Sequence, residues 1–302
     1  MNTDQIEWIA ADWGTSNLRC WAMSETNEVL FRAESNQGMG PITSGHGDFE
    51  LALLELIQPW LRSGKRISVA ACGMVGAKQG WIEAPYSAAP CSPITERITA
   101  PTRSTEIEVF IHAGVKQLDP ADVMRGEETQ IAGLLVNSPD FEGLVCLPGT
   151  HTKWATVSDG HIQRFQTYLT GELFTLLAEQ SVLRLTLAPE GWSEPAFLDA
   201  LLSAVKSPES LLSDCFSLRA DALLNELDGV EARSRLSGYL IGQEIANTMK
   251  GPAPDRIALI GSDEIVEIYR VALDALGWKA EIFPSETTVL AGLAKGNASF
   301  DN

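Results

Sequence analysis

The sequence predicts an α/β protein with two similar lobes, and three observations support this fold class. The chain has 302 residues, which is enough for two domains of ordinary size. Short apolar runs typical of strands alternate with longer segments in which apolar residues recur at helical spacing. One order of elements, three strands followed by helix and strand, also recurs in the second half. We therefore predict an N-terminal lobe over residues 1–140 and a C-terminal lobe over residues 141–302.

The first lobe is predicted to begin with three strands, because each run of strand-forming residues is bounded by turn residues. A segment with helical apolar spacing follows, and then two apolar runs short enough to be buried strands. A further helix closes the lobe. In chain order, the expected elements are strands at residues 7–12, 17–23 and 28–34, a helix at 49–61, strands at 67–72 and 107–113, and a helix at 124–136.

The second lobe is predicted to repeat the three strands and then to add a series of helices. Gly238 and Gly242 lie four residues apart on one of these helices, so a second helix can cross it closely. We expect that crossing to lie between the lobes and to act as a hinge. In chain order, the expected elements are strands at 144–147, 153–157 and 161–168, helices at 172–183, 195–203, 208–226 and 233–250, a strand at 256–260, a helix at 262–276, a strand at 280–283 and a helix at 286–296.

The turn between the first two predicted strands has the composition of a phosphate-binding loop. Gly14 has no Cβ, so a phosphate can approach its backbone. Thr15, Ser16 and Asn17 add side-chain donors beside the N–H groups of the turn, and together these groups favour an anion. Asp12 would repel a phosphate unless a cation lay between them, so its position indicates Mg²⁺. An ordinary hairpin turn of similar composition is the alternative.

A second turn of this kind follows the first strand of the second lobe. Gly149 and Thr150 repeat the Gly-Thr pair of the first turn. Lys153 supplies a positive charge for a second phosphate, or it is a solvated strand residue. His151 is either part of the same site or a hydrogen-bonded core histidine.

One later turn, at Gly261 and Ser262, joins a predicted strand to a predicted helix. A glycine at such a turn allows a ligand to approach the backbone, so this turn could hold the adenosine of a nucleotide. The alternative is a plain β–α turn in which Ser262 caps the helix.

Two adjacent glutamates lie in the last predicted helix of the first lobe. On a helix, Glu127 shares a face with the apolar residues Ile131, Leu134 and Leu135, whereas Glu128 is turned about 100° away. We therefore predict that Glu127 points inward, where it could accept a proton from a hydroxyl group. Acidic residues in a first turn also complement the helix dipole, so a purely structural role is the alternative.

The acidic composition limits the partners that this protein can bind. The formal net charge of −18 argues against nucleic acids and anionic membranes, which bind basic patches. No apolar run has the length of a membrane span, and the N-terminal segment does not resemble a signal peptide, so we expect a cytoplasmic protein. The five cysteines have no Cys-x-x-Cys spacing, which argues against a zinc or redox site. The oligomeric state is open, with a homodimer as one option.

Together, these motifs resemble the actin/hexokinase-like kinases, which have two lobes of a duplicated ribonuclease H-like fold and a cleft between them. In that superfamily an Asp-x-Gly-Thr turn opens one lobe, a Gly-Asp pair carries the catalytic base and a second Gly-Thr turn opens the other lobe. A late glycine-rich turn holds adenosine. The matching segments are Asp12–Thr15, Gly126–Glu127, Gly149–Thr150 and Gly261. Because glutamate replaces aspartate at the base, Glu128 is kept as a second candidate.

More narrowly, the sequence is similar to the 2-dehydro-3-deoxygalactonokinase family. Each matching stretch is short, but together they span nearly the whole chain, and the combination is specific. The stretches are Asp12–Arg19, Cys72–Gly76, Gly80–Trp81, Ala84–Tyr86, Val123–Gln130, Pro148–His151, Lys153–Trp154, Thr170–Leu173, Ser237–Gly238 and Leu240–Gly242.

This resemblance implies phosphorylation of 2-dehydro-3-deoxy-D-galactonate at its 6-hydroxyl, with MgATP as donor, in galactonate catabolism. It implies Glu127 as the base and Asp12 as the residue that holds Mg²⁺. The segment after the strand at 67–72 would line the sugar-acid pocket, although Trp81 could instead pack in the core. An arginine would pair with the substrate carboxylate. The residues expected to contact the sugar acid are Arg19, Met74, Gln79, Trp81 and Arg125.

Three other functions are compatible with the same motifs. The protein could be a kinase of the same fold that acts on a different sugar acid. It could be a nucleotide-dependent sensor or ATPase that transfers phosphate to no metabolite, although the Gly-Glu pair and the short chain count against this. A catalytically inactive sugar-binding regulator is the third, and intact Asp12, Glu127 and Gly149 weigh against it.

Overall fold

A computed structural model describes residues 3–62, 64–251 and 254–300 of the chain. None of the helices in this part of the chain is both long and apolar enough to cross a lipid bilayer. The chain divides into two compact units. Unit 1 comprises Met1–Phe141, Val157–Phe165 and Ser285–Asn302, and unit 2 comprises Glu142–Thr156 and Gln166–Pro284.

The main sheet of unit 1 has the strand order β3-β2-β1-β4-β7-β6. Strands β1, β2 and β3 are antiparallel neighbours, while β4 pairs in parallel with both β1 and β7. A small sheet of order β5-β8-β9 lies in the same unit. The strands are β1 Trp8–Trp13, β2 Leu18–Met23, β3 Val29–Ser35, β4 Ile67–Gly73, β5 Tyr86–Ala88, β6 Arg97–Thr99, β7 Ile107–His112, β8 Gly114–Leu118 and β9 Ala121–Met124.

The second large sheet repeats this arrangement. Its order is β12-β11-β10-β13-β14, so its first three strands in the chain stand in the same 3-2-1 order, with two parallel strands beyond them. The predicted duplication of the fold is therefore confirmed. The strands are β10 Gly143–Leu147, β11 Thr152–Ser158, β12 His161–Tyr168, β13 Ile257–Gly261 and β14 Glu281–Pro284.

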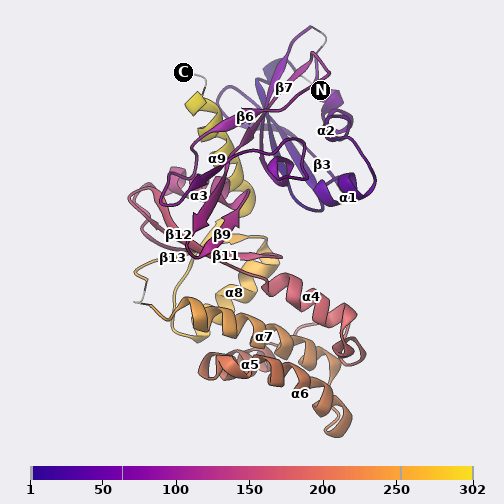
Figure 1. The fold of residues 1–302 in the computed structure, drawn as a ribbon, viewed down its shortest axis with the longest axis vertical. Helices are drawn as coiled ribbons and strands as arrows, with labels where there is room; N and C mark the ends of the chain where they lie inside the picture. Colours follow the sequence, from indigo (N-terminus) through magenta and orange to yellow (C-terminus); the bar gives the residue numbers. More distant parts are fainter. Residues whose placement is uncertain (1–2, 63, 252–253, 301–302) are drawn as a thin grey trace. The chain divides into compact units, whose positions relative to one another are not determined.

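Most of the helices match segments that the sequence predicts to be helical (Figure 1). The main departures are the short helix α1 and the strands β5, β6, β8 and β9. These elements are too short to show a hydrophobic period. The helices are α1 Met39–Ser44, α2 Phe49–Ile57, α3 Glu127–Asn137, α4 Thr170–Gln180, α5 Glu194–Lys206, α6 Leu211–Leu224, α7 Gly229–Thr248, α8 Asp263–Ala275 and α9 Ser285–Phe300.

The C-terminal helix α9 belongs to unit 1, although the predicted boundary assigns it to the second lobe. Its residues Val289 and Leu293 are buried with Trp8 and Ala10 of β1. Helix α9 also crosses α3 at very short range, because glycine occupies the contact on both helices. A Cβ atom on Gly292 would lie 1.9 Å from the backbone oxygen of Thr129.

The glycine pair on α7 permits a close crossing, but within one unit. Cβ atoms on Gly238 and Gly242 would overlap Phe197 and Leu201 of α5. Both α5 and α7 belong to unit 2, where they lie side by side (Figure 1). The expected close packing is therefore confirmed, whereas the expectation that this crossing forms a hinge between the lobes is wrong.

Candidate active site

The predicted phosphate turn of unit 1 is a tight link between β1 and β2. The Gly14 amide donates a hydrogen bond to the Asn17 carbonyl oxygen at 2.9 Å. The side chains of Thr15, Ser16 and Asn17 are exposed. The segment before α1 supports this turn, because the Gly38 amide donates to the Ser16 carbonyl oxygen at 3.0 Å. The turn is thus held rigidly while its donors face outward.

Asp12 lies two residues before Gly14, and its side chain is largely buried. Its side chain is 13% exposed and forms an ion pair with Arg19, its register partner on β2. The Cys72 thiol of β4 donates to the same carboxylate at 3.8 Å. Burial raises the pKa of Asp12, and the Arg19 charge acts against this effect. A buried carboxylate of this kind is suited to a cation.

Two glycines bring the start of α3 close to the ends of β1 and β4. Gly73 has φ +87°, and a Cβ atom there would lie 2.5 Å from the Trp13 carbonyl oxygen. Gly126 has φ +108°, and its Cβ would lie 3.2 Å from the Gly73 Cα. Only glycine tolerates both the conformation and the crowding. The helix therefore begins at Glu127, and the predicted start near Met124 is wrong because β9 extends to that residue.

The two adjacent glutamates of α3 occupy different environments. Glu128 is fully buried and accepts hydrogen bonds from the Gly126 amide at 2.7 Å and the Thr129 hydroxyl at 3.1 Å. Glu127 is half-buried and accepts from the Arg125 amide at 2.9 Å. Burial, reinforced by the charge of Glu127, raises the pKa of Glu128 to about 8.

The prediction that Glu127 is the inward-pointing glutamate is therefore wrong. Glu128 shares the buried face of α3 with Ile131 and Leu135, at spacings of three and seven residues. Glu127 lies at the edge of that face, and its charge contributes to the raised pKa of Asp12. Unit 1 thus brings Asp12, Arg19 and Glu127 together, with Glu127 the more accessible of the two helix glutamates.

Two of the expected sugar-acid residues, Met74 and Gln79, follow β4. Met74 is half-buried at the start of a short 3₁₀ helix, Met74–Gly76. Gln79 is exposed. Because β4 ends at Gly73, which contacts Trp13, this segment begins beside the Asp12 turn.

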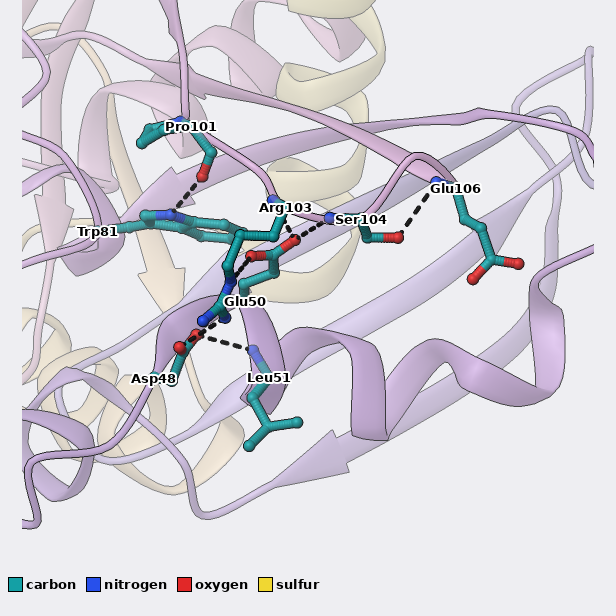
Figure 2. Close-up of polar contacts among 8 residues, drawn as sticks. All are labelled: Asp48, Glu50, Leu51, Trp81, Pro101, Arg103, Ser104 and Glu106. Carbon is teal, nitrogen blue, oxygen red and sulfur yellow. Dashed lines mark hydrogen bonds and ion pairs between the residues drawn. The ribbon is translucent and has the colours of Figure 1, made fainter.

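Trp81 is fixed by its neighbours. It is half-buried against the core of unit 1, with its ring edge-on to Trp13 at 6.4 Å between centroids. Its indole N–H donates to the Pro101 carbonyl oxygen at 3.0 Å (Figure 2). This geometry supports the packing interpretation of Trp81, and its contact with a sugar stays a prediction.

An ion cluster around buried Glu50 holds the loop that receives the Trp81 hydrogen bond. Glu50, only 4% exposed, accepts from the backbone amides of Arg103 and Ser104 and from the Arg103 guanidinium (Figure 2). Asp48 caps α2 through the Leu51 amide and also accepts from Arg103 at 2.6 Å. Burial acts to raise the pKa of Glu50, but these hydrogen bonds outweigh it and the pKa is lowered. The cluster thus stabilises one wall beside Trp81.

Arg125 is a buried cation whose hydrogen-bonding capacity is only partly used. Its guanidinium stacks on the Tyr86 ring at 4.1 Å and donates to the Ala84 carbonyl oxygen at 2.9 Å. Its Nη1 atom, close to Gly76, has no hydrogen-bond partner among the described residues. Leaving a buried charged donor unpaired is costly, so this atom calls for an anionic partner.

The second Gly-Thr turn lies in unit 2 and is open to solvent. Gly149 and Thr150 are exposed, and a Cβ on Gly149 would meet no atom within 4 Å. The start of α4 packs against this turn, since a Cβ on Gly171 would lie 2.4 Å from the Gly149 carbonyl oxygen. The Glu172 amide donates to the Thr150 carbonyl oxygen at 2.9 Å. The turn therefore combines a fixed backbone with room for a ligand.

For His151 and Lys153, the structure excludes the purely structural alternatives that the sequence left open. His151 is not a core residue: its side chain is 46% exposed, and its Nε2 lies 2.6 Å from a Glu172 carboxylate oxygen. Lys153 is not solvated: it is 5% exposed, and its Nζ donates to the His151 carbonyl oxygen at 3.3 Å. Lys153 thus places a buried positive charge at the second turn.

A pocket of about 780 Å³ opens beside the second turn, within unit 2. Gly149, Thr170 and Gly171 form one end of it, and residues of α7 and α8 form its walls. Arg233 stacks on Phe174 at 4.8 Å in its lining. Pockets of this size accommodate small-molecule ligands. No local sequence pattern indicates this pocket, because its lining comes from five separate segments, one of which includes Thr170 and Gly171.

Gly261 and Ser262 lie next to the second turn but do not line this pocket. A Cβ on Gly261 would lie 3.4 Å from the Pro148 ring. Ser262 precedes α8 at the capping position without a side-chain capping bond. The pocket instead uses Glu264, Ile265 and Ile268 from the helix that follows.

These features define the class of protein. Two sheets share one strand order, and a Gly-Thr turn follows the first strand of each. A helix that begins with carboxylates stands at the strand ends of unit 1. This is the actin/hexokinase-like fold, and the predicted fold class is confirmed.

Comparison with known proteins gives the family. Residues 12–295 match the family described as 2-keto-3-deoxy-galactonokinase. The sequence is 35% identical over 295 residues to a probable 2-dehydro-3-deoxygalactonokinase of Rhizobium meliloti, with 95% of each chain covered. It is 33% identical over 292 residues to the 2-dehydro-3-deoxygalactonokinase of Escherichia coli, with 95% of this chain and 96% of the relative covered. The chain therefore belongs to the 2-keto-3-deoxy-galactonokinase family, as the sequence predicted.

The crystal structure of a protein from Sinorhizobium meliloti, described as a putative 2-dehydro-3-deoxygalactonokinase, shares the fold. It has a TM-score of 0.90 and 32% sequence identity, and the alignment covers 97% of this chain and 96% of that one. The similarity extends over both units, so each of the two sheets belongs to the common architecture of the family.

Proposed function

We propose that this protein transfers the γ-phosphoryl group of ATP to the 6-hydroxyl of 2-dehydro-3-deoxy-D-galactonate, in galactonate catabolism. Membership of the kinase family over nearly the whole chain supports the reaction class and the substrate. The observation that carries the chemistry is the half-buried carboxylate of Glu127 beside Asp12 at the head of α3. A carboxylate that is held in place yet accessible is what general-base catalysis needs.

We assign the proton transfer to Glu127 rather than Glu128. Glu128 is fully buried, and its two oxygens already accept hydrogen bonds from Gly126 and Thr129. A pKa of about 8 keeps it largely protonated at neutral pH, so it is a poor base there. Glu127 has the exposure that a substrate hydroxyl requires. Most of the rate enhancement would come from positioning and charge stabilisation.

Each unit by itself offers groups suited to a nucleotide. The pocket of unit 2 has the size for adenosine, and Gly149 lines one end of it. Thr150, His151 and buried Lys153 follow Gly149 in the chain and would bind the phosphates. Gly261 and Ser262 would shape the turn next to it. In unit 1, the exposed donors Thr15, Ser16 and Asn17 would bind a phosphate beside Gly14. A charged Lys and backbone amides are typical phosphate ligands.

Asp12 suits the Mg²⁺ that accompanies ATP in phosphoryl transfer. Mg²⁺ keeps several waters and takes one or two carboxylates together with substrate phosphates, so a single hard oxygen donor is sufficient. Burial raises the pKa of Asp12, so a nearby cation would favour its ionised form. Mg²⁺ would neutralise charge on the phosphates. Arg19, which pairs with Asp12, would contribute positive charge at the same end.

The substrate carboxylate would pair with Arg125. In the extended acid, the carboxylate is at the opposite end from the 6-hydroxyl. Because the 6-hydroxyl would lie near Asp12, the partner of the carboxylate should lie farther from Asp12. Arg19 contacts Asp12 itself, whereas the Arg125 side chain reaches Ala84 and Tyr86. The unpaired Nη1 atom supports this choice. Met74, Gln79 and Trp81 would complete the sugar-acid site.

A substrate panel tests this proposal. ADP release would be measured with 2-dehydro-3-deoxy-D-galactonate, with its C4 epimer and with other sugar acids, and the product would be identified by mass spectrometry. We expect the galactonate derivative to give the highest kcat/KM and a 6-phosphorylated product. Preference for a different acid would favour a kinase of another substrate. A rate of ADP release that no sugar acid changes would favour a nucleotide-dependent sensor or ATPase.

The cytoplasmic location and the homodimer stay predictions from the sequence. Size-exclusion chromatography with light scattering would give the oligomeric state directly.

A further inference from the structure

A buried carboxylate in the centre of unit 2 connects the elements around the pocket. Glu244 of α7 is 0% exposed. Its Oε1 atom accepts a hydrogen bond from the Trp154 indole N–H at 2.7 Å. Its Oε2 atom accepts from the Thr170 hydroxyl, and the Tyr269 hydroxyl lies 3.0 Å from both oxygens. One side chain thus joins α7 to β11, α4 and α8.

Two of these contacts lead directly to the second Gly-Thr turn. Thr170 is the first residue of α4 and lines the pocket, and the next residue, Gly171, packs on the Gly149 carbonyl oxygen. Tyr269 also lines the pocket, and its hydroxyl lies 3.1 Å from that of buried Thr152, just beyond the turn. The orientation of the turn therefore depends on the bonds that Glu244 accepts.

The protonation state of Glu244 determines the direction of these hydrogen bonds. An ionised carboxylate can accept from Trp154, Thr170 and Tyr269 at once, and Tyr269 can then accept from Thr152. A protonated carboxyl must donate its own proton, and the indole N–H cannot accept it. The hydroxyl of Thr170 or Tyr269 must therefore accept this proton instead of donating its own to Glu244. Its own proton then turns to another acceptor, which changes the orientation of Thr170 or, through Tyr269, of Thr152.

We propose that Glu244 is a positioning residue for nucleotide binding. Its ionised carboxylate holds Thr170 and Thr152, and through them the second Gly-Thr turn, in the orientation that binds the phosphates of ATP. Protonation of Glu244 weakens nucleotide binding. The inference rests on the proposed function only in assigning the unit 2 pocket to the nucleotide.

The titration falls in an accessible pH range. Burial raises the pKa of Glu244 to about 7, and hydrogen bonds from Thr170, Trp154 and Tyr269 act against this rise. The other titratable groups that face it are Cys146 of β10, Tyr168 of β12 and Tyr269 of α8. Burial raises the pKa of each of them above its ordinary value, and the charge of Glu244 adds to the effect. Near neutral pH, Glu244 is thus the member of this group that changes charge.

The test is the dissociation constant of MgADP, measured by calorimetry without sugar acid. Measurements would run from about one unit below to about one and a half units above the pKa of Glu244. Loss of one or two oriented hydrogen bonds should weaken wild-type binding roughly three- to tenfold towards acid pH. Glu244→Gln, which mimics the protonated form, should bind with the weak acid-side affinity throughout. It also corrects for titration of the nucleotide itself. Glu231→Gln, on the exposed start of α7, is the matched control.

Thr170→Val provides a second variant if Glu244→Gln does not fold. It removes the donor at the pocket wall and should weaken MgADP binding to a similar extent at alkaline pH. Wild-type affinity and pH dependence in a folded Glu244→Gln protein would overturn the role of Glu244. Absence of MgADP binding by the wild-type protein would overturn the nucleotide pocket itself, and this proposal with it.

Discussion

At the scale of single residues, the site depends on differences between neighbours of the same type. Glu127 and Glu128 are adjacent and identical, yet one is half-buried beside Asp12 and the other is fully buried. Arg19 and Arg125 differ in a similar way, because Arg19 pairs with Asp12 and Arg125 keeps one donor unpaired. These differences assign separate roles to residues of the same type.

The first prediction concerns the base. Glu127→Gln keeps the size of the side chain but cannot accept a proton, so kcat should fall by at least about a hundredfold. The dissociation constant for MgATP should stay within about threefold of the wild-type value, since the nucleotide contacts are elsewhere. Steady-state kinetics and calorimetry check both values. Near-normal turnover in this variant, together with a large loss in Glu128→Gln, would transfer the role to Glu128.

The second prediction concerns Arg125. Arg125→Met should raise the KM for the sugar acid roughly 10- to 100-fold, the range expected for a charge-assisted hydrogen bond, and leave the KM for ATP nearly unchanged. The wild-type protein should prefer the acid strongly over its uncharged amide, and the variant should lose that preference. Tyr86→Phe, which removes only the hydroxyl at 3.4 Å from Arg125 Nε, is the control. An equal loss for acid and amide would point to packing alone.

At the scale of elements, close helix crossings position the catalytic helix. The first turn of α3 is placed by Gly73 and Gly126 at one side and by the crossing with α9 at the other. In that crossing, Gly133 meets the backbone of Thr288, and Gly292 meets the backbone of Thr129. The C-terminal helix therefore supports the part of α3 that carries Glu127 and Glu128.

The third prediction tests this support. Gly292→Ala places a methyl group 1.9 Å from the Thr129 carbonyl oxygen, so the helices must separate. We expect a loss of about 1–3 kcal/mol in the free energy of unfolding, as for other overpacked contacts, accompanied by a lower kcat. Chemical denaturation and kinetics measure both. Gly251→Ala, where the added Cβ meets nothing within 4 Å, should change neither. A Gly292→Ala protein as stable as the wild type would contradict the crossing.

At the scale of the whole molecule, buried carboxylates link stability to pH. Burial raises the pKa of Glu128 to about 8 and that of Glu244 to about 7, well above the values of unfolded glutamate. The folded state therefore holds protons that the unfolded state has already lost. The resulting stability is fully present at acid pH, below the unfolded pKa, and is lost as the pH rises through the folded values.

The fourth prediction follows from that sign. The free energy of unfolding should decrease as the pH rises from about 5 to about 9, the interval that separates the unfolded and folded pKa values. Glu128→Gln, which cannot ionise, should lose less stability over this interval than the wild type. The remaining decrease would come largely from Glu244. Urea denaturation at several pH values measures the slope, and an equal slope in both proteins would contradict the buried-acid assignment.

The sequence by itself determined the repeated order of elements along the chain, the positions of the two Gly-Thr turns and the family. The elements and turns follow from local composition and from the period of apolar residues, which a single segment contains in full. The family follows from the resemblance of short motifs along nearly the whole chain. Tertiary structure alone decided that Glu128 is the buried glutamate, that α9 belongs to unit 1 and that the Gly238–Gly242 crossing lies within unit 2. It also revealed the network around Glu244. Burial and pairing depend on neighbours from distant parts of the chain, such as Gly73 against Gly126 or Gly292 against Thr129, and no local pattern encodes those neighbours.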